Sequence, residues 1–149
     1  MGPSGEVYAA EDLAYHAACA VKLFPAGLEA AAITRLLAEF GRLSELGHRG
    51  IVRVRDAGRI AEGALAGRLF LVTDQLAGPD LSAHLAAAEG DDRFRRFVGT
   101  AEDLADAVAY LHGRGIVHGD ISPGNVRCDH EGRPVLIDFG LSERLLAVP

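Results

Sequence analysis

The pattern of apolar and polar positions near the start of the chain predicts two strands joined by a polar turn. Two short apolar runs, 7–10 and 17–24, are separated by a polar turn at Glu11-Asp12. Small and β-branched side chains in such runs are typical of strands that bury one face. A further pair of runs, 51–57 and 68–73, has the same character. The first half of the chain is therefore expected to form an antiparallel sheet.

Two other segments have a helical period. Apolar residues recur at three- and four-residue steps over 28–46 and stop before Gly47, a residue type common just beyond helix C-termini. Glu39 lies beside this apolar stripe, so its side chain can point toward the interior. A second stripe over 94–111 predicts a long helix that closes near Gly113.

Glycine and proline divide the chain into two parts. The sequence Gly-Pro-Asp at 78–80 interrupts the periodic segments, and a boundary is expected near 76–79. Beyond it, Asp80 or Ser82 can cap a short helix that runs toward Ala88. Strands before the boundary and helices after it predict the α+β fold class.

A second, shorter hairpin is predicted near the end of the chain. The segments 126–128 and 134–137 flank the turn residues 129–132, Asp-His-Glu-Gly. Antiparallel strands pair residue by residue, so the two ends of such a hairpin lie side by side. The polar residues before the first strand and after the second therefore stand at fixed separations around one short hairpin.

Composition narrows the class of protein without identifying it. The 149 residues can bury one sizeable core, and 49% of them are hydrophobic. The net charge of −6 argues against a general nucleic-acid or anionic-membrane surface. Cys19 and Cys128 lack metal-ligand spacing and are interpreted as buried thiols in a reducing compartment. Without a signal peptide or an apolar run of about eighteen residues, a cytoplasmic protein with no membrane segment is expected.

The polar residues around the second hairpin carry the strongest chemical signal. His118-Gly119-Asp120 is followed by Asn125, and Asp138 comes thirteen residues after Asn125 as the start of Asp-Phe-Gly. Carboxylate and carboxamide oxygens are ligands that hard divalent cations prefer, and a further carboxylate can accept a hydroxyl proton. The spacing indicates a site that holds divalent metal beside a nucleoside triphosphate while a hydroxyl is deprotonated.

Lysine is scarce, which makes Lys22 informative. It is the one lysine among fifteen basic residues, and it lies in the strand-like sequence Ala20-Val21-Lys22. A compact ammonium on a flexible stem can reach between two phosphates, whereas a planar guanidinium is bulkier. An arbitrary strand lysine more often extends along its aliphatic stem to water. The position of Lys22 upstream of the other motifs favours the phosphate role.

Taken in order, these segments resemble a bacterial, eukaryotic-like serine/threonine protein kinase domain. Residues 2–8 are similar to the latter part of the glycine-rich phosphate loop, and 20–22 to the third-strand lysine motif. Residues 48–52 are similar to the turn after the regulatory helix, and 118–125 with 138–140 to the catalytic loop and Asp-Phe-Gly. The resemblance implies a two-lobed fold, with a small antiparallel-sheet lobe carrying one helix and the first part of a helical lobe.

Under this resemblance, residues 1–149 are a partial kinase domain. The small lobe would cover 1–77, and 78–149 would begin the large lobe. The chain starts inside the phosphate loop and ends nine residues after Gly140, before any Ala-Pro-Glu motif. A fragment without the platform for a protein substrate is therefore expected, with weak activity and low solubility on its own.

The resemblance also implies roles for the polar residues. Asp120 would accept the proton of the attacking hydroxyl. Asn125 and Asp138 would hold Mg²⁺, with Mn²⁺ as the second candidate, against the phosphate oxygens of ATP. Lys22 would bind the α- and β-phosphates and form an ion pair with Glu39.

Further residues are assigned to ATP binding by the same resemblance: Gly2, Gly5, Val7, Ala20, Thr73, Asp74 and Leu76. The two glycines would let the backbone approach phosphate closely. Val7 and Ala20 would cover the adenine, and Thr73 would guard the rear of its pocket. The backbone of Asp74 and Leu76 would hydrogen-bond the adenine edge. For the apolar residues, a plain role in the core is the competing interpretation.

Four residues in and near the catalytic loop carry separate expectations. Gly119 stands where many kinases have an arginine that binds an activation-loop phosphate, so activity independent of that phosphorylation is expected. Ser122 replaces a lysine that helps to neutralise the γ-phosphate, which should change rate rather than fold. Arg127 replaces an apolar residue under the adenine, where its stem can pack or its guanidinium can stack on the base. His118 is expected to pack and hydrogen-bond beneath Asp-Phe-Gly.

Three function classes stay open at this point. The leading one is an ATP-dependent protein kinase that acts on a serine or threonine hydroxyl of a protein, with no nucleic-acid partner. His-Gly-Asp followed by asparagine also resembles the loop of aminoglycoside and choline kinases, which are small-molecule phosphotransferases. A non-catalytic nucleotide-binding module is the third. Asp-Phe-Gly and the 48–52 turn favour the protein kinase.

Overall fold

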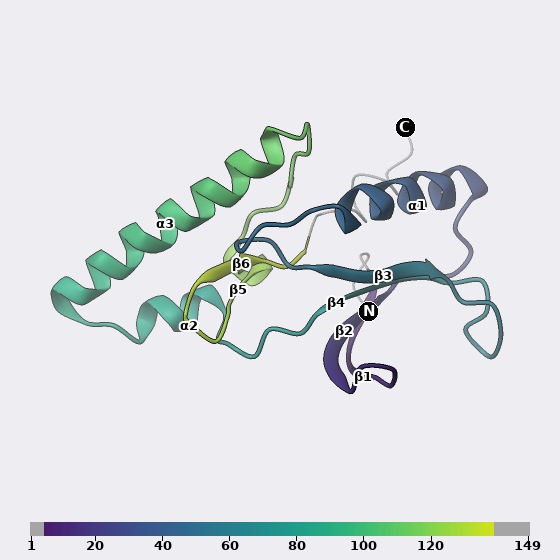
Figure 1. Cartoon of the computed structure of the whole chain (residues 1–149), viewed down its shortest axis with the longest axis horizontal. Coiled ribbons are helices and arrows are strands. Elements are labelled where there is room, and N and C mark those ends of the chain that lie inside the picture. The colour runs from purple at the N-terminus through teal and green to yellow at the C-terminus, as the bar shows by residue number, and fades with distance from the viewer. Residues whose placement is uncertain (1–4, 139–149) are drawn as a thin grey trace. The chain divides into compact units, whose positions relative to one another are not determined.

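The computed structural model describes residues 5–138, and these form two compact units (Figure 1). The first unit comprises residues up to 46 together with 53–75, and the second comprises 47–52 together with 76–138. Within the described residues the chain therefore passes three times from one unit to the other. The assignment of 47–52 to the helical unit is a feature that the sequence pattern did not indicate.

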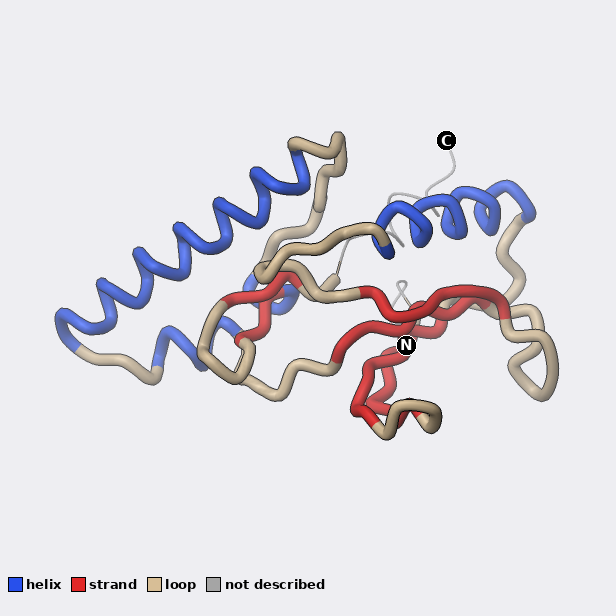
Figure 2. The backbone as a smooth tube through the Cα atoms, in the orientation of Figure 1, coloured by secondary structure: helices blue, strands red, loops and turns tan. Residues whose placement is uncertain are grey.

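A four-stranded antiparallel sheet forms most of the first unit (Figure 2). In the order β1-β2-β4-β3, its strands are β1 (Glu6–Asp12), β2 (Ala17–Leu23), β4 (Leu69–Asp74) and β3 (Val54–Arg59). The sequence predicted all four strands, but it began the third at Ile51. That boundary was wrong because Ile51 forms a parallel bridge with Leu136 in the second unit.

The turn of the first hairpin also lies later than predicted. The polar pair Glu11-Asp12, predicted to form the turn, is the last paired part of β1. The Asp12 carboxylate accepts hydrogen bonds from the amides of Ala14 (2.9 Å) and Tyr15 (3.2 Å). It therefore organises the turn from the strand end, as turn-forming aspartates do. Polarity alone did not separate an exposed strand end from a turn.

Helix α1 (Ala30–Ser44) lies against β3 and completes the core of the first unit. Its apolar stripe buries Leu36 and Phe40, and the Phe40 ring centre lies 5.2 Å from that of Phe24. Burial of such side chains stabilises a fold by about 1.5–3 kcal/mol each. The helix is shorter than the predicted 28–46 because Glu29, its N-cap residue, has an extended backbone.

In the second unit, the segment before helix α2 (Leu81–Ala86) packs closely on the second hairpin. Asp80 caps α2, as predicted, by accepting a hydrogen bond from the amide of Ala83 (2.8 Å). A Cβ atom at Gly78 would overlap the carbonyl of Cys128. Glycine is therefore required where this segment meets the hairpin.

Helix α3 (Gly90–His112) is the longest helix of the described residues. It begins four residues before the predicted start at 94, because the first turn is polar and carries no apolar stripe. Asp91 and Asp92 lie in that turn, where the helix dipole favours negative charge. Ala107 and Leu111 are fully buried farther along the helix. Nowhere in residues 5–138 is a helix both long and apolar enough to cross a membrane.

The second hairpin was predicted at the observed position. A short 3-10 turn, η1 (Pro123–Asn125), leads into β5 (Val126–Cys128), which pairs with β6 (Pro134–Leu136). Five of the six strand residues are buried, all except Arg127. Apart from Arg127, the strand residues of this hairpin therefore form part of the core of the second unit.

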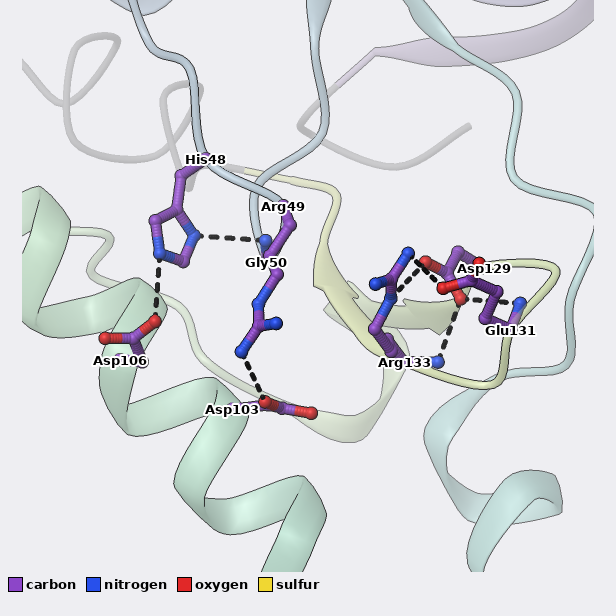
Figure 3. A network of polar contacts seen from close by, with 8 residues as sticks. All are labelled: His48, Arg49, Gly50, Asp103, Asp106, Asp129, Glu131 and Arg133. Atoms are coloured by element: carbon purple, nitrogen blue, oxygen red, sulfur yellow. Dashed lines mark hydrogen bonds and ion pairs between the residues drawn. The ribbon is translucent and has the colours of Figure 1, made fainter.

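The turn of this hairpin is organised by one carboxylate (Figure 3). One oxygen of Asp129 accepts hydrogen bonds from the amides of Glu131 and Arg133, both at 2.9 Å. The other oxygen accepts from the Arg133 Nε at 3.0 Å. The turn is thus fixed by backbone and side-chain bonds together.

Two contacts fix the segment 47–52 against α3 (Figure 3). The His48 Nε2 lies 3.1 Å from a carboxylate oxygen of Asp106, and the Arg49 guanidinium lies 3.4 Å from Asp103. Such partly exposed pairs contribute little stability individually, commonly under about 1 kcal/mol. Their geometric effect is to hold the segment along one side of the helix.

The same segment also pairs with β6. The amide of Val52 donates to the carbonyl of Leu136, and the amide of Leu136 donates to the carbonyl of Gly50, both at 2.9 Å. A Cβ atom at Gly50 would lie 2.9 Å from the Cβ of Ala107, closer than side chains tolerate. Glycine therefore allows this segment to fit between α3 and the hairpin.

Candidate active site

The loop that leads into β5 brings Asp120 and Asn125 together. The Asn125 Nδ2 donates to a carboxylate oxygen of Asp120 at 2.6 Å and to its main-chain carbonyl at 2.9 Å. The turn η1 creates this contact, because the Asn125 amide bonds the carbonyl of Ser122 at 2.9 Å and folds the chain back. Asp120 is exposed, so its carboxylate is accessible to a reacting hydroxyl.

Asp138 follows directly on the hairpin ladder that includes Asn125. The amide of Ile137 donates to the carbonyl of Asn125 at 3.0 Å, which extends the pairing past the end of β6. With its Nδ2 committed to Asp120, Asn125 has its carboxamide oxygen as the atom suited to a cation. A carboxamide and a carboxylate oxygen at neighbouring strand ends fit the ligand preference of Mg²⁺ or Mn²⁺. Residues 139 and 140, the rest of Asp-Phe-Gly, lie outside the described residues.

His118 is a buried support for the same loop. Its side chain is among the most buried polar groups of the described residues, and its Nδ1 accepts a hydrogen bond from the amide of Asp120 at 3.3 Å. Burial lowers the pKa of this imidazole, and the charges of Asp138 and Asp120 act in the opposite direction. A neutral imidazole that accepts from the backbone suits a buried supporting position. The predicted packing of His118 beneath Asp-Phe-Gly stays a prediction, because residues 139 and 140 lie outside the described residues.

In the first unit, four of the residues assigned to ATP binding share one face of the sheet. The strand register pairs Lys22 with Val7, and it pairs Ala20 with Thr73. Directly opposed and alternate residues of a sheet share a face, so these four positions form one group. Val7 is 65% exposed, and the Lys22 Nζ lies 5.5 Å from the ring centre of Phe24.

Glu39 has a different partner from the one expected. Its carboxylate pairs with Arg42 at 3.3 Å, and no ion pair between Glu39 and Lys22 is found in the described part of the chain. Arg42 lies one turn farther along α1, where side chains three residues apart are neighbours. That spacing is visible in the sequence, and sequence reasoning missed it. The predicted role of Glu39, to hold Lys22 in position to bind the phosphates, stays a prediction.

Asp74 and Leu76 lie at the end of the first unit and the start of the second. The amide of Asp74 donates to the carbonyl of Arg53 at 3.0 Å, and its carboxylate pairs with Arg55. An adenine contact from Asp74 would therefore use its carbonyl. Leu76 is the first residue of the second unit after β4.

Of the two glycines assigned to ATP binding, Gly5 is among the described residues. Gly5 has a φ of 105°, and a Cβ atom there would overlap the carbonyl of Leu23. Its lack of a side chain is thus already required by its close approach to the end of β2. Gly2 lies outside the described residues.

Comparison with known proteins decides the family. The sequence matches the protein kinase domain over residues 1–147. The chain belongs to the protein kinase family. Members of this family use ATP with a divalent metal ion, and the side-chain oxygens of Asn125 and Asp138 are of a type that suits such an ion.

Bacterial serine/threonine-protein kinases are among its relatives. The chain is 34% identical over 140 residues to the DNA damage-responsive serine/threonine-protein kinase RqkA of Deinococcus radiodurans, covering 94% of this chain and 20% of that protein. It is 39% identical over 113 residues to PkaA of Streptomyces coelicolor (74% and 20%), and 29% identical over 146 residues to PrkC of Bacillus subtilis (97% and 22%). The chain spans about a fifth of the length of these relatives.

The glycine at position 119, a departure from the kinase pattern, has a backbone conformation that suits glycine. Gly119, where many kinases have arginine, has a φ of 82°, in the left-handed region that glycine adopts freely. An arginine in this conformation would cost roughly 1–2 kcal/mol of strain. The glycine is therefore matched to the path of this loop.

Proposed function

We propose that the chain forms the nucleotide-binding and catalytic part of an ATP-dependent serine/threonine protein kinase. The observation that carries this proposal is the double hydrogen bond from the Asn125 carboxamide to Asp120, in a chain of the kinase family. The relatives described above are serine/threonine-protein kinases, which supports a protein rather than a small-molecule substrate. The whole reaction would transfer the γ-phosphoryl group of ATP to a serine or threonine hydroxyl.

Asp120 acts on the attacking hydroxyl. Its carboxylate orients the hydroxyl and accepts its proton as the new bond to the γ-phosphorus forms and the bond to the β–γ bridging oxygen breaks, releasing ADP. The hydrogen bond from Asn125 holds this carboxylate in one orientation. Fixed orientation matters because misplacement of reacting groups costs orders of magnitude in rate.

Asn125 and Asp138 hold the divalent metal, with Mg²⁺ as the first candidate and Mn²⁺ as the second. The bound ion supplies positive charge against the phosphate oxygens. Lys22, with Glu39, Gly2 and Gly5, completes the phosphate site.

The adenine site is formed by Val7, Ala20 and Thr73, together with the backbone of Asp74 and Leu76. The shared sheet face of the first three supports this grouping. A cytoplasmic location is part of the proposal, and it is supported by Cys19 and Cys128, which are buried free thiols.

Calorimetry of ATP binding, combined with a phosphorylation assay on a generic protein substrate, tests this function. Binding should require Mg²⁺ and weaken strongly in Asp138→Ala. Asp120→Asn should keep ATP affinity and lower the rate of transfer by about 100-fold or more. Asp92→Asn removes an exposed carboxylate of α3 and is the matched control. Equal affinity with and without Mg²⁺, or full activity of Asp120→Asn, would contradict the proposal.

A further inference from the structure

Helix α3 carries a second apolar stripe, on a face that the described residues leave exposed. Phe94 is 70% exposed and Phe97 is 57% exposed. Val98, Ala101 and Ala105 are also exposed and follow at three- and four-residue steps. These steps place all five residues on one side of the helix, about 120° around its axis from the face that α3 buries in the second unit. An exposed apolar patch that contains two aromatic rings is typical of an interaction site.

The side chains of this stripe change in size along the helix. The phenylalanines lie toward the N-terminus of α3, and the alanines lie toward its C-terminus. In an antiparallel pair of identical helices, each residue faces the residue at the same distance on the other side of the centre. When that centre lies near Gly99, Phe94 of one helix faces Ala105 of the other. Phe97 then faces Ala101. Each large ring meets a small side chain, which lets two such helices pack closely.

The charges beside the stripe are complementary in the same register. Arg95 and Glu102 flank the stripe on the same side, two turns apart. About the same centre, Arg95 of one copy faces Glu102 of the other, so a symmetric antiparallel pair has two contacts between opposite charges. A parallel pair in register would instead place like charges together. Arg95 also lies 3.8 Å from Asp92 of its own helix, and this exposed pair is weak enough for the guanidinium to turn toward a partner.

We propose that a second copy of this chain covers the stripe, with two α3 helices packed antiparallel about a twofold axis near Gly99. Aromatic side chains bordered by charged ones are typical of interfaces between proteins. Asp91 and Glu102 beside the stripe disfavour an anionic membrane surface as the occupant. The stripe covers about three turns of one helix, so the interface is small and the dimer forms at micromolar concentrations.

Sedimentation equilibrium of the 149-residue chain measures this association directly. The wild type should approach twice the mass of one chain as its concentration rises through the micromolar range. Phe97→Ala should weaken dimerisation by about 30-fold or more, because both copies lose an aromatic ring from the interface. Phe97 is exposed in the single chain, so this variant should fold, which circular dichroism checks.

An exchange of charges tests the antiparallel register. Arg95→Glu and Glu102→Arg should each weaken dimerisation by about 10-fold or more, because each sets like charges opposite one another at two places. The double variant Arg95→Glu/Glu102→Arg should return to within about 3-fold of the wild type, since it restores both contacts with their signs exchanged. Arg53→Glu reverses an exposed charge of the first unit and, as the matched control, should dimerise as the wild type does.

Three results would contradict the inference. A wild type that stays monomeric up to about 200 μM would mean that another segment or partner covers the stripe. Association that continues beyond the dimer and does not respond to the charge variants would be nonspecific aggregation of the apolar face. A double variant no stronger than either single variant would refute the antiparallel register. The substituted residues lie outside the proposed catalytic site, so each of these results leaves the proposed function standing.

Discussion

The two hairpins use the same turn device in different surroundings. In β1–β2, the Asp12 carboxylate accepts two turn amides, and in β5–β6 the Asp129 carboxylate accepts two amides and an arginine. In the first hairpin, β1 has no buried residue and β2 has two, while the three-residue strands of the second hairpin are almost wholly buried. Packing, rather than strand length, therefore holds in place the hairpin on which the proposed metal ligands lie.

Truncation of a strand side chain should give the largest difference between the hairpins in the free energy of unfolding. Leu136 of β6 is 0% exposed, so Leu136→Ala should lower the free energy of unfolding by about 2–5 kcal/mol. Val7→Ala in β1 should change it by no more than about 0.5 kcal/mol, since Val7 is largely exposed. Urea denaturation followed by circular dichroism measures both. Equal losses would show that the two hairpins are packed alike.

Removal of the turn carboxylate should lower the free energy of unfolding by less than Leu136→Ala does. The loss should again be larger in the second hairpin than in the first. Asp129→Ala removes bonds in a partly buried turn and should cost about 1–3 kcal/mol in the free energy of unfolding. Asp12→Ala removes two exposed bonds and should cost about 0.5–1 kcal/mol. Asp129→Asn keeps an acceptor for the amides but loses the charge, so its cost should be intermediate. A larger cost for Asp12 than for Asp129 in the same denaturation experiment would reverse the comparison.

The smallest expected effect is a pH dependence of the stability that the Asp129 carboxylate contributes. Burial acts to raise the pKa of Asp129, but hydrogen bonds from the Arg133 amide, the Arg133 side chain and the Glu131 amide outweigh it, so the pKa is lowered. The unfolded chain then binds the proton more readily than the folded protein. The stabilisation is complete above the unfolded pKa of about 3.9 and is lost as pH falls through the lower folded pKa.

Denaturation of the wild type and Asp129→Asn between about pH 2.5 and pH 6 measures this dependence. The difference in their free energies of unfolding should be constant above about pH 4.5 and should shrink below it. A difference that does not change with pH would mean that the charge of Asp129 contributes nothing to stability.

The sequence predicted the elements whose signals are local. The hairpin around 129–132 and the cap at Asp80 follow from turn and capping chemistry within a few residues. Ile51 was misplaced because its partner, Leu136, is far away in the chain and no local pattern reports such a contact. The early start of α3 was missed because its first turn is polar and lacks periodicity.

For the site, spacing alone predicted that Asp120 and Asn125 belong together, and the structure joins them by two hydrogen bonds. The partner of Glu39 was not predicted, because the family pattern points to Lys22 while the nearest cation on the same helix is Arg42. A motif indicates which residues can meet. The side-chain conformations that decide among neighbouring partners depend on the packing around them.

The pairing of the segment 47–52 with β6 affects the order in which the two units can fold during synthesis on the ribosome. Val52 bonds to Leu136, which is made 84 residues later, or roughly 4–17 s later at about 5–20 residues per second. The first unit has all its described strands once β4 has left the exit tunnel. The second unit cannot close until nearly the whole described chain has emerged, because a nascent chain stalled before residue 136 lacks both the complete β5–β6 pairing and Asp138 itself.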